Sequence, residues 1–566
     1  MDGFRGAGGQ AGGRAALARR AASFAAALVS TWLIPPPAAG QLPDSVQRQI
    51  HEVFSDFDHT NSPGCALAVY RDGEIVFARG YGMANLELGI AIAPRTVFDI
   101  GSTSKQFTAF AVQLLAEDGK LSLDDPVRKH FPEMPAYADR ITIRNLVQHT
   151  SGLRDYLALM SLAGYNFDDV TDDADALKLI VRQHAPNFAP DSEWLYSNSG
   201  YFLLSQIVKR VSGKTLRQFA AERIFQPLGM QVTHFHDDHT MIVPNRATGY
   251  SPAGNAGYRI DMSNFEQTGD GAVYTTVEEL LLWDRNWYAG TVGGQALLAR
   301  QLETGKLMSG EDHGYAGGVM VGQYRDVKTV RHGGAWAGYR AELLRFPEQR
   351  TSIACLCNRA DADPSARADR VADVLLAKLG SKPAREGAAT TPAATVSPEQ
   401  LARLAGGWRS PATGDVVIFE ARDGKLYLLG WGRPLTPAGP DRFTLGPFTY
   451  VWSAEPAPAV KLERSGKTQD TYQRLPAVTV DSTALSVYAG TWYSQELDTE
   501  WRIVPAGNRL RIEIRERPSG MLRPAGPDLF SDGQRHLVFT RRGDRVTGMT
   551  VSAGRVRGIG FTRRGT

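Results

Sequence analysis

Residues 101–115, Gly-Ser-Thr-Ser-Lys-Gln-Phe-Thr-Ala-Phe-Ala-Val-Gln-Leu-Leu, decide the fold of this chain. Apolar residues recur from Phe107 at i, i+3, i+4, i+7 and i+8, which is the period of a helix packed on a core. Gly119 supplies a stop signal. The pattern predicts a helix over 103–118, with Ser102 directly before it and Lys105 in its first turn.

Ser102 and Lys105 are three positions apart, so a helix places the hydroxyl and the amine on one face. The unpaired N–H groups at that helix N-terminus can stabilise a developing oxyanion. Lys105 can take the proton of Ser102 once burial and neighbouring cations lower its pKa. This chemistry fits an acylating serine hydrolase. The alternative, an amphipathic helix with a serine cap, stays open because Ser-x-x-Lys alone is a weak motif.

Tyr196-Ser197-Asn198 is a second candidate group, directly before a helical pattern over 199–212. A tyrosine hydroxyl beside a lysine can relay a proton to a leaving group. The Asn198 amide can donate to a substrate carbonyl. An ordinary turn with an aromatic anchor is the alternative interpretation of these residues.

His332-Gly333-Gly334-Ala335 is a third candidate group, and a strand pattern follows it. Glycines here let a substrate backbone lie against the strand edge. The Ala335 N–H would join the Ser102 N–H as the second oxyanion donor. The alternative is a glycine-rich bend with an incidental histidine.

The three groups stand in the order and spacing of the penicillin-recognising serine hydrolases. Over residues 45–380 the chain resembles their class C β-lactamase-like branch, which includes DD-peptidases, D-aminopeptidases and carboxylesterases. Residues 146–153 and 269–276 also resemble this branch. The resemblance implies an α+β fold of the β-lactamase/transpeptidase type, an antiparallel sheet flanked by helices, with no cofactor.

The chain departs from the family pattern at His332, where typical β-lactamases and DD-peptidases carry the lysine of Lys-Thr-Gly. A neutral imidazole lacks the permanent charge that helps to hold a substrate carboxylate. This variant resembles the D-aminopeptidase and esterase members, and such D-aminopeptidases carry two C-terminal barrels. We expect His332 either to support Tyr196 electrostatically or to contact the substrate.

Composition and charge exclude several classes of protein. The 566 residues are 43% hydrophobic and 22% charged, as in soluble globular proteins. A net charge of +3, without a basic run among aromatics, argues against nucleic acid as a partner.

The first forty residues resemble a targeting segment. Arg14, Arg19 and Arg20 precede an apolar run over 21–34, and small residues follow at 38–40. This order is typical of a signal peptide over 1–40, which predicts a periplasmic or secreted protein. An uncleaved anchor is the alternative, but the run is short for a bilayer, and we expect no membrane span in the mature chain.

Residues 41–380 form the predicted hydrolase domain. Strand patterns over 65–70 and 74–78 join at Arg71-Asp72-Gly73, and further strands are expected over 331–347 and 351–357. Helical patterns cover 173–184, 276–288 and 366–379. The simplest arrangement is an antiparallel sheet that holds both ends of the segment. Residues 381–397, rich in Ala, Thr and Pro, form a predicted linker.

An internal repeat follows the linker. Leu401, Trp408 and Ser410 return 84 positions later as Leu485, Trp492 and Ser494, and residues 437–441 return 87 positions later at 524–528. Each copy has short alternating strands broken by turns. We predict two small antiparallel, lipocalin-like β-barrels over 398–480 and 481–566.

Two tempting clusters receive simpler interpretations. Cys65, Cys355 and Cys357 are too few for a disulfide framework, and core filling is the predicted role of the last two. Residues 234–239, His-Phe-His-Asp-Asp-His, have the spacing of metal ligands but lie in a polar loop. We predict no metal there, and we expect His149 to hydrogen-bond within the fold.

These patterns together predict an exported serine hydrolase that acts through an acyl-enzyme on a D-amino-acid amide, a short peptide or a related small acyl substrate. The predicted catalytic residues are Ser102, Lys105, Tyr196 and His332; the predicted substrate-binding residues are Asn198, Gly334 and Ala335. A carboxylesterase or β-lactamase of the same fold is the first alternative. The second is a non-catalytic protein that binds peptidoglycan or peptides. The sequence leaves the oligomeric state open.

Overall fold

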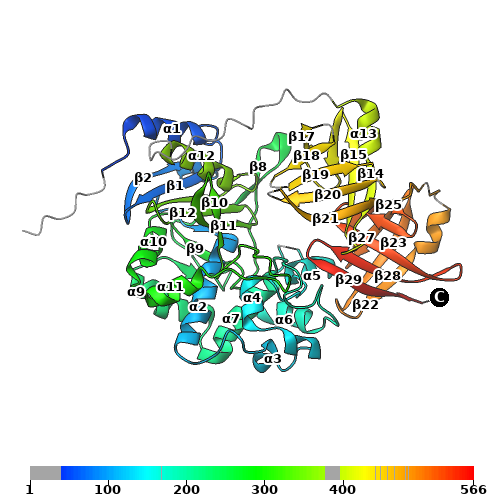
Figure 1. Cartoon of the computed structure of the whole chain (residues 1–566), viewed down its shortest axis with the longest axis horizontal. Helices are drawn as coiled ribbons and strands as arrows, with labels where there is room; N and C mark the ends of the chain where they lie inside the picture. The colour runs from blue at the N-terminus through cyan, green and yellow to red at the C-terminus, as the bar shows by residue number, and fades with distance from the viewer. Residues whose placement is uncertain are drawn as a thin grey trace, which may run out of the picture.

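The computed structural model describes residues 40–166, 168–376, 396–439, 441–446, 448–454, 457–464, 466–478, 480–481 and 483–565. The predicted signal peptide, apart from Gly40, and the predicted linker, apart from its last two residues, lie outside this part of the chain. A mixed α and β domain comes first, and two β modules pack beside it (Figure 1). Among the described residues, every helix is too short or too polar to cross a bilayer.

A six-stranded antiparallel sheet forms the centre of the first domain, in the order β10-β11-β12-β13-β1-β2. Its strands are β1 (Cys65–Arg71), β2 (Glu74–Tyr81), β10 (Met320–Tyr324), β11 (Val327–Trp336), β12 (Tyr339–Phe346) and β13 (Thr351–Cys357). β1 pairs with both β2 and β13, so the sheet holds both ends of the domain, as predicted. The predicted hairpin turns at Asp72 and Gly73, both with positive φ, which Asp-Gly favours.

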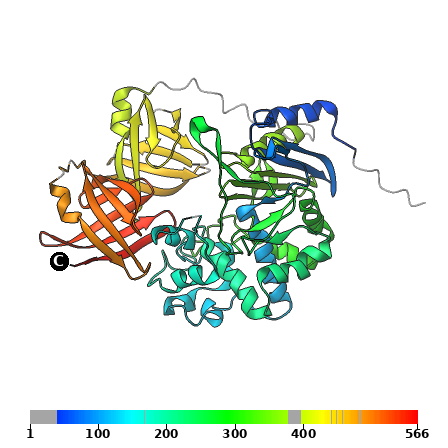
Figure 2. The same cartoon turned by 180° about the vertical axis from the view of Figure 1, so that it is seen from behind.

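Strand β1 is buried on both faces of this sheet. Because neighbouring residues of a strand point to opposite faces, its apolar residues enter two separate cores. Cys65, Leu67 and Val69 pack in a core with α1 (Asp44–Phe54) and α12 (Pro364–Leu376). The other face carries the larger core and the remaining helices of the domain (Figure 2).

The remaining helices surround that larger core. They are α2 (Lys105–Glu117), α3 (Val127–His130), α4 (Ile143–Gln148), α5 (Tyr156–Leu162), α6 (Asp173–Val181), α7 (Asn198–Ser212), α8 (Leu216–Ala220), α9 (Gln226–Leu228), α10 (Leu280–Ala289) and α11 (Gly294–Gln301). The short strands are β3 (Met83–Asn85), β4 (Ile90–Ala91), β5 (Phe98–Asp99), β6 (His234–Phe235), β7 (Tyr250–Pro252), β8 (Tyr258–Ile260) and β9 (Val273–Thr275). Helix α2 packs against α7, α8 and α11, so it is buried from Lys105 to Leu115, more completely than its sequence pattern indicates.

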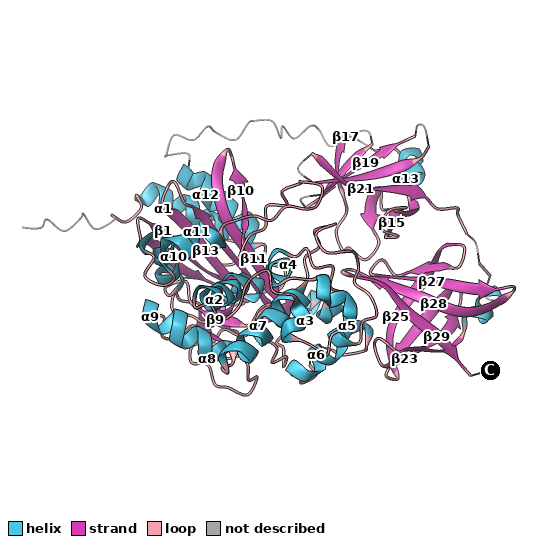
Figure 3. Cartoon of the chain, turned by 60° about the horizontal axis from the view of Figure 1, so that its bottom comes forward, coloured by secondary structure: helices cyan, strands magenta, loops and turns pink. Residues whose placement is uncertain are grey.

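The second β module is a closed eight-stranded barrel (Figure 3). Its strands are β22 (Gly490–Ser494), β23 (Thr499–Ala506), β24 (Arg509–Ile514), β25 (Arg517–Gly526), β26 (Leu529–Ser531), β27 (Arg535–Arg542), β28 (Arg545–Ala553) and β29 (Val556–Arg564). The first module, after α13 (Pro398–Leu404), is a curled eight-stranded sheet. Its strands are β14 (Gly406–Arg409), β15 (Val416–Arg422), β16 (Lys425–Leu428), β17 (Thr436–Gly439), β18 (Arg442–Leu445), β19 (Phe448–Ser453), β20 (Ala459–Arg464) and β21 (Lys467–Arg474).

The two modules differ in how they close. The edge strands β16 and β17 have four residues each, and a single bridge, Tyr427 to Pro434, joins that gap within the described chain. The equivalent β24 and β25 have six and ten residues and form a full ladder. The repeat is also visible in side chains: the indole N–H of Trp408 donates to Leu404 O, and that of Trp492 donates to Tyr488 O.

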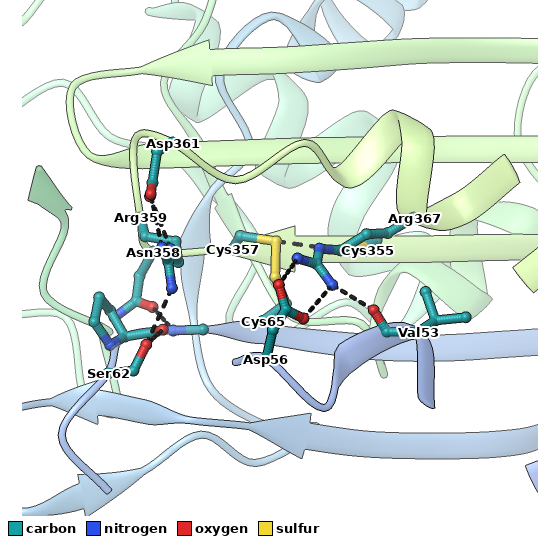
Figure 4. The surroundings of a disulfide bond; sticks show 12 residues. Val53, Asp56, Ser62, Cys65, Cys355, Cys357, Asn358, Arg359, Asp361 and Arg367 are labelled. Atoms are coloured by element: carbon teal, nitrogen blue, oxygen red, sulfur yellow. Dashed lines mark hydrogen bonds and ion pairs between the residues drawn. A yellow bond between two sulfur atoms is a disulfide. The ribbon is translucent and has the colours of Figure 1, made fainter. Parts of the chain in front are cut away.

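The structure corrects the core-filling prediction for Cys357, whose partner is Cys65, a residue without a predicted role of its own. Cys65 and Cys357 lie opposite each other in the β1–β13 pairing and form a disulfide (Figure 4). Cys355 is buried and free, as predicted. The bonded residues are 292 positions apart, so their pairing depends on a strand register that no local pattern reveals.

Candidate active site

Ser102 lies in a short turn, η1 (Gly101–Ser104), directly before α2. This turn approaches β11 so closely that a Cβ at Gly334 would lie 1.9 Å from Ile100 O, and one at Gly101 would lie 2.7 Å from Ala335 N. Gly101 also has a φ of +48°, a conformation that favours glycine. Both glycines are therefore needed to bring the serine beside β11, a reason for Gly334 that sequence analysis did not provide.

Lys105 is buried, and its amine lies at the centre of the site. Nζ lies 3.1 Å from Ser102 Oγ and 2.9 Å from Asn198 Oδ1, and it also donates to the Asp270 carbonyl. A neutral amine has two N–H groups and one lone pair. It can therefore donate to the Asn198 and Asp270 oxygens and accept from the Ser102 hydroxyl. Burial lowers the pKa of Lys105 to about 7, against the opposing charge of Asp270, so a base is present near neutral pH.

Asn198 and Tyr196 are positioned by the chain that enters α7. The Asn198 N–H donates to Asp155 Oδ2 at 2.8 Å. The Ser197 N–H donates to His149 Nδ1 at 3.2 Å, so His149 hydrogen-bonds within the fold, as expected. The two acceptors fix the turn that presents the Tyr196 ring and the Asn198 amide to Ser102.

The Tyr196 ring faces the amine of Lys105, with its centroid 4.8 Å from Nζ. Its hydroxyl is buried and makes no hydrogen bond of ordinary geometry with the described residues. Burial raises the pKa of Tyr196, and the Ser102 hydroxyl and the Arg555 guanidinium oppose that rise. Tyr196 is therefore protonated at neutral pH and has a proton to give.

Both ring nitrogens of His332 are engaged within the protein. Nδ1 lies 2.6 Å from Gly333 O, and Nε2 lies 3.0 Å from the Tyr315 hydroxyl. Because a carbonyl only accepts, Nδ1 carries the proton and Nε2 accepts from Tyr315. Burial lowers the pKa of His332 to about 4, so the ring is neutral at neutral pH. The ring therefore lacks the charge that electrostatic support of Tyr196 would need. Contact of His332 with the substrate stays a prediction.

A small cavity of about 60 Å³ lies on one side of Ser102. Ser102 and Ala335, the residues of the two predicted oxyanion donors, both line it. Its wall also includes Asp99 and Asp270, which are nearly inaccessible to solvent. Burial raises the pKa of Asp99 to about 7 and that of Asp270 to about 6. β10 pairs with β11 only as far as Arg331. In the described chain, residues 332–336 of β11 therefore have no paired strand on the edge that faces β10.

A more open cavity of about 470 Å³ lies on the other side and is lined by Ser102, Tyr196, His332 and Arg555. Arg555 belongs to the turn between β28 and β29 of the closed barrel, and sequence analysis did not identify it. Its guanidinium carbon lies 4.7 Å from the centroid of the Tyr196 ring. The second barrel therefore completes one wall of the site.

Buried polar contacts hold this barrel on the hydrolase domain. Arg154 and Glu496 form an ion pair at 2.6 Å, and both side chains are buried. The Trp501 indole N–H donates to Leu162 O, at the end of α5, at 2.9 Å. Because breaking a buried charge pair leaves an uncompensated charge, the barrel is a fixed part of the site wall.

The His234–His239 cluster is divided among separate contacts. Asp237 pairs with Arg217 at 2.9 Å, and His239 pairs with Glu266 at 2.6 Å. Asp238, His239 and Glu266 each offer an atom within 4.8 Å of the others, at a partly exposed position. The lack of a metal here stays a prediction.

The chain resembles known hydrolases along most of its length. It is 28% identical over 527 residues to a D-aminopeptidase of Cereibacter sphaeroides and 27% identical over 523 residues to one of Brucella melitensis; each comparison covers 88% of this chain and 96% of the relative. Among solved structures, the octameric penicillin-binding protein homologue from Pyrococcus abyssi matches with a TM-score of 0.54 and 22% identity, over 84% of this chain and 98% of its own. The D-amino acid amidase from Ochrobactrum anthropi SV3 matches with a TM-score of 0.51 and 21% identity, over 59% of this chain and 99% of its own. The family model described as Beta-lactamase matches residues 50–378. The chain therefore belongs to the Beta-lactamase family and is a serine hydrolase of that fold.

Proposed function

We propose that this hydrolase is an exported D-aminopeptidase that forms an acyl-enzyme on Ser102. The observation that carries the proposal is the small cavity beside Ser102, with Asp99 and Asp270 in its wall. Two buried carboxyl groups favour a cationic group, and the α-ammonium of an aminoacyl substrate is such a group. The D-aminopeptidase relatives support the D-configuration of that residue.

The proposed reaction moves one proton from the serine to the leaving nitrogen. Ser102 Oγ attacks the substrate carbonyl while neutral Lys105 takes the hydroxyl proton. The Ser102 and Ala335 N–H groups hold the tetrahedral oxyanion. Tyr196 gives a proton to the leaving nitrogen as the C–N bond breaks, and the lysine proton then restores Tyr196. Water attacks the ester carbonyl, releases the acid and returns the proton to Ser102.

The same geometry ranks the alternative substrates. The acids of the small cavity would repel a penicillin carboxylate, so this subsite favours an aminoacyl substrate over a β-lactam. Esters fit the same catalytic residues, but they need no subsite that binds a cation. A purely binding protein needs no buried lysine with a lowered pKa beside a serine, and this argues against the non-catalytic alternative.

Export is the second part of the proposal. The pattern of residues 1–40 supports it, and so does the Cys65–Cys357 disulfide, because disulfides persist mainly in oxidising compartments. Mass spectrometry of the protein from a periplasmic or culture fraction tests this part. A mature N-terminus near Gln41 is expected, and an intact Met1 in the cytoplasmic fraction would contradict it.

Release of p-nitroaniline from D-alanine p-nitroanilide tests the activity. We expect turnover of the D-isomer, little of the L-isomer, and none with Ser102→Ala. N-acetylation of the substrate removes the ammonium and should abolish turnover, and Asp99→Asn should raise KM for the free amine. Equal turnover of the acetylated and the free-amine substrates would overturn the proposal that Asp99 and Asp270 bind the α-ammonium. Turnover of esters alone would assign an esterase.

A further inference from the structure

The turn that carries Arg555 is fixed by its backbone. The Arg555 carbonyl accepts from Asn187 Nδ2 at 2.8 Å and from the Asp155 N–H at 3.4 Å. Two residues on, the Arg557 N–H donates to Asn187 Oδ1 at 2.8 Å. The hydrolase domain thus sets the position of the Arg555 side chain, which is a property of a binding residue more than of a mobile loop.

The guanidinium of Arg555 has capacity for a further anion. Within the described chain its one ion pair is with Asp155, at 3.4 Å, and 43% of the side chain is exposed. Asp155 itself is already shared, because it also accepts from the N–H groups of Asn198, Leu157 and Ala158. A guanidinium has five N–H donors, and Arg555 lines the open cavity beside Ser102, so it has donors left for a further acceptor there.

The charged residues of this cavity favour an anion. Arg340 lines it together with Arg555, against the single acid Asp363. Asp363 caps α12 by accepting a hydrogen bond from the Ala366 N–H, so one of its carboxylate oxygens is already engaged. His332 is neutral, and Nη1 of Arg340 already donates to the carbonyl oxygens of Ala337 and Tyr339, so Arg555 is the arginine with donors left for an anion.

The place of Arg555 identifies the part of the substrate that it meets. Its guanidinium lies over the ring of Tyr196, the residue proposed to protonate the leaving nitrogen. We propose that Arg555 binds a carboxylate on the leaving group, so that the enzyme prefers D-aminoacyl dipeptides with a free C-terminus over simple amides. This inference rests on the proposed function. It gives the closed barrel a part in substrate selection: it supplies the cation that typical family members carry at the position of His332.

Paired substrates that differ only in this charge test the inference. D-alanyl-glycine and D-alanyl-glycinamide would be compared by release of free D-alanine, in wild type, Arg555→Gln and Arg555→Lys. A charge-assisted hydrogen bond predicts that wild-type kcat/KM is about 10–100-fold higher for the free acid. Arg555→Gln should bring the ratio close to one, and Arg555→Lys should keep part of it.

Arg557→Gln is the matched control. Arg557 lies on the same hairpin and pairs with Glu193 at 3.0 Å, away from the cavity that holds Arg555. It should keep the wild-type ratio even if looser docking lowers both rates. Equal wild-type rates for the two substrates, or a ratio unchanged in Arg555→Gln, would overturn the inference and leave the proposed function intact. If Arg555→Gln does not fold, Arg555→Lys decides: a reduced ratio supports the inference, and a ratio unchanged from wild type overturns it. Hydrolysis of neither substrate overturns the proposed function and, with it, this inference.

Discussion

Protonation of Lys105 should control how fast Ser102 is acylated. An ordinary lysine, with a pKa of about 10.4, has only about 0.04% of its amine neutral at pH 7. With its pKa lowered to about 7, Lys105 is half neutral at that pH, an increase of about 10³-fold in available base. Below about pH 6 the neutral fraction falls about tenfold per unit, and above pH 8 it exceeds about 90%.

A fluorophosphonate probe measures this dependence directly, because the probe has no titrating group of its own. The second-order rate of Ser102 labelling, followed by mass spectrometry, should rise about 50-fold from pH 5 to 7 and level off above pH 8. Lys105→Arg provides the control, since its guanidinium stays protonated; labelling should fall by about 10²–10⁴-fold. Asp270→Asn removes a negative charge that favours the Lys105 ammonium, so it should lower the pKa of Lys105 and move the rising part of the rate–pH profile to lower pH. A rate that is flat from pH 5 to 9, or still rising at pH 10, would refute the assignment of Lys105 as the base.

Three further predictions address the proton donor, the disulfide and the close approach of the nucleophile. Tyr196→Phe should lower kcat for D-alanine p-nitroanilide by at least tenfold with little change in melting temperature; a smaller loss means that another group protonates the leaving nitrogen. Cys65→Ala should lower the free energy of unfolding by about 2–5 kcal/mol in urea titrations, because the disulfide closes a 292-residue separation. Cys355→Ala, which keeps the disulfide, is its control. Without reductant, Cys65→Ala should have the stability that wild type has in reductant, and Cys355→Ala should not. Gly334→Ala should cost about 10²-fold in kcat/KM by displacing the serine, whereas Gly322→Ala, whose added Cβ has its nearest neighbour at 3.9 Å, should retain wild-type activity.

The sequence predicts well those features that depend on local spacing. The three-residue separation of Ser102 and Lys105 is preserved at the start of α2, and their atoms lie 3.1 Å apart. The Asp72-Gly73 turn joins β1 and β2 as expected, and the repeated Trp408 and Trp492 occupy matching places in the two β modules. Each of these features is encoded within a few residues of chain or by self-similarity.

Features that depend on tertiary placement could not be predicted in this way. The Cys65–Cys357 bond requires the register of two distant strands. Asp270 contributes a backbone carbonyl to the Lys105 amine, and a carbonyl leaves no mark on residue type. Arg555 enters the site because the whole barrel docks on the hydrolase domain, so its own neighbours in sequence give no signal.

The anchoring of the closed barrel has a consequence for biosynthesis. The chain emerges from its N-terminus, so the serine, lysine and tyrosine are made long before the β28–β29 turn. The wall beside Tyr196 is complete only after the last strands have emerged, closed into a barrel and docked on Arg154 and Leu162. We therefore expect a nascent chain, or a chain truncated before β28, to lack the full specificity of the folded protein, which delays selective hydrolysis until the barrel has formed.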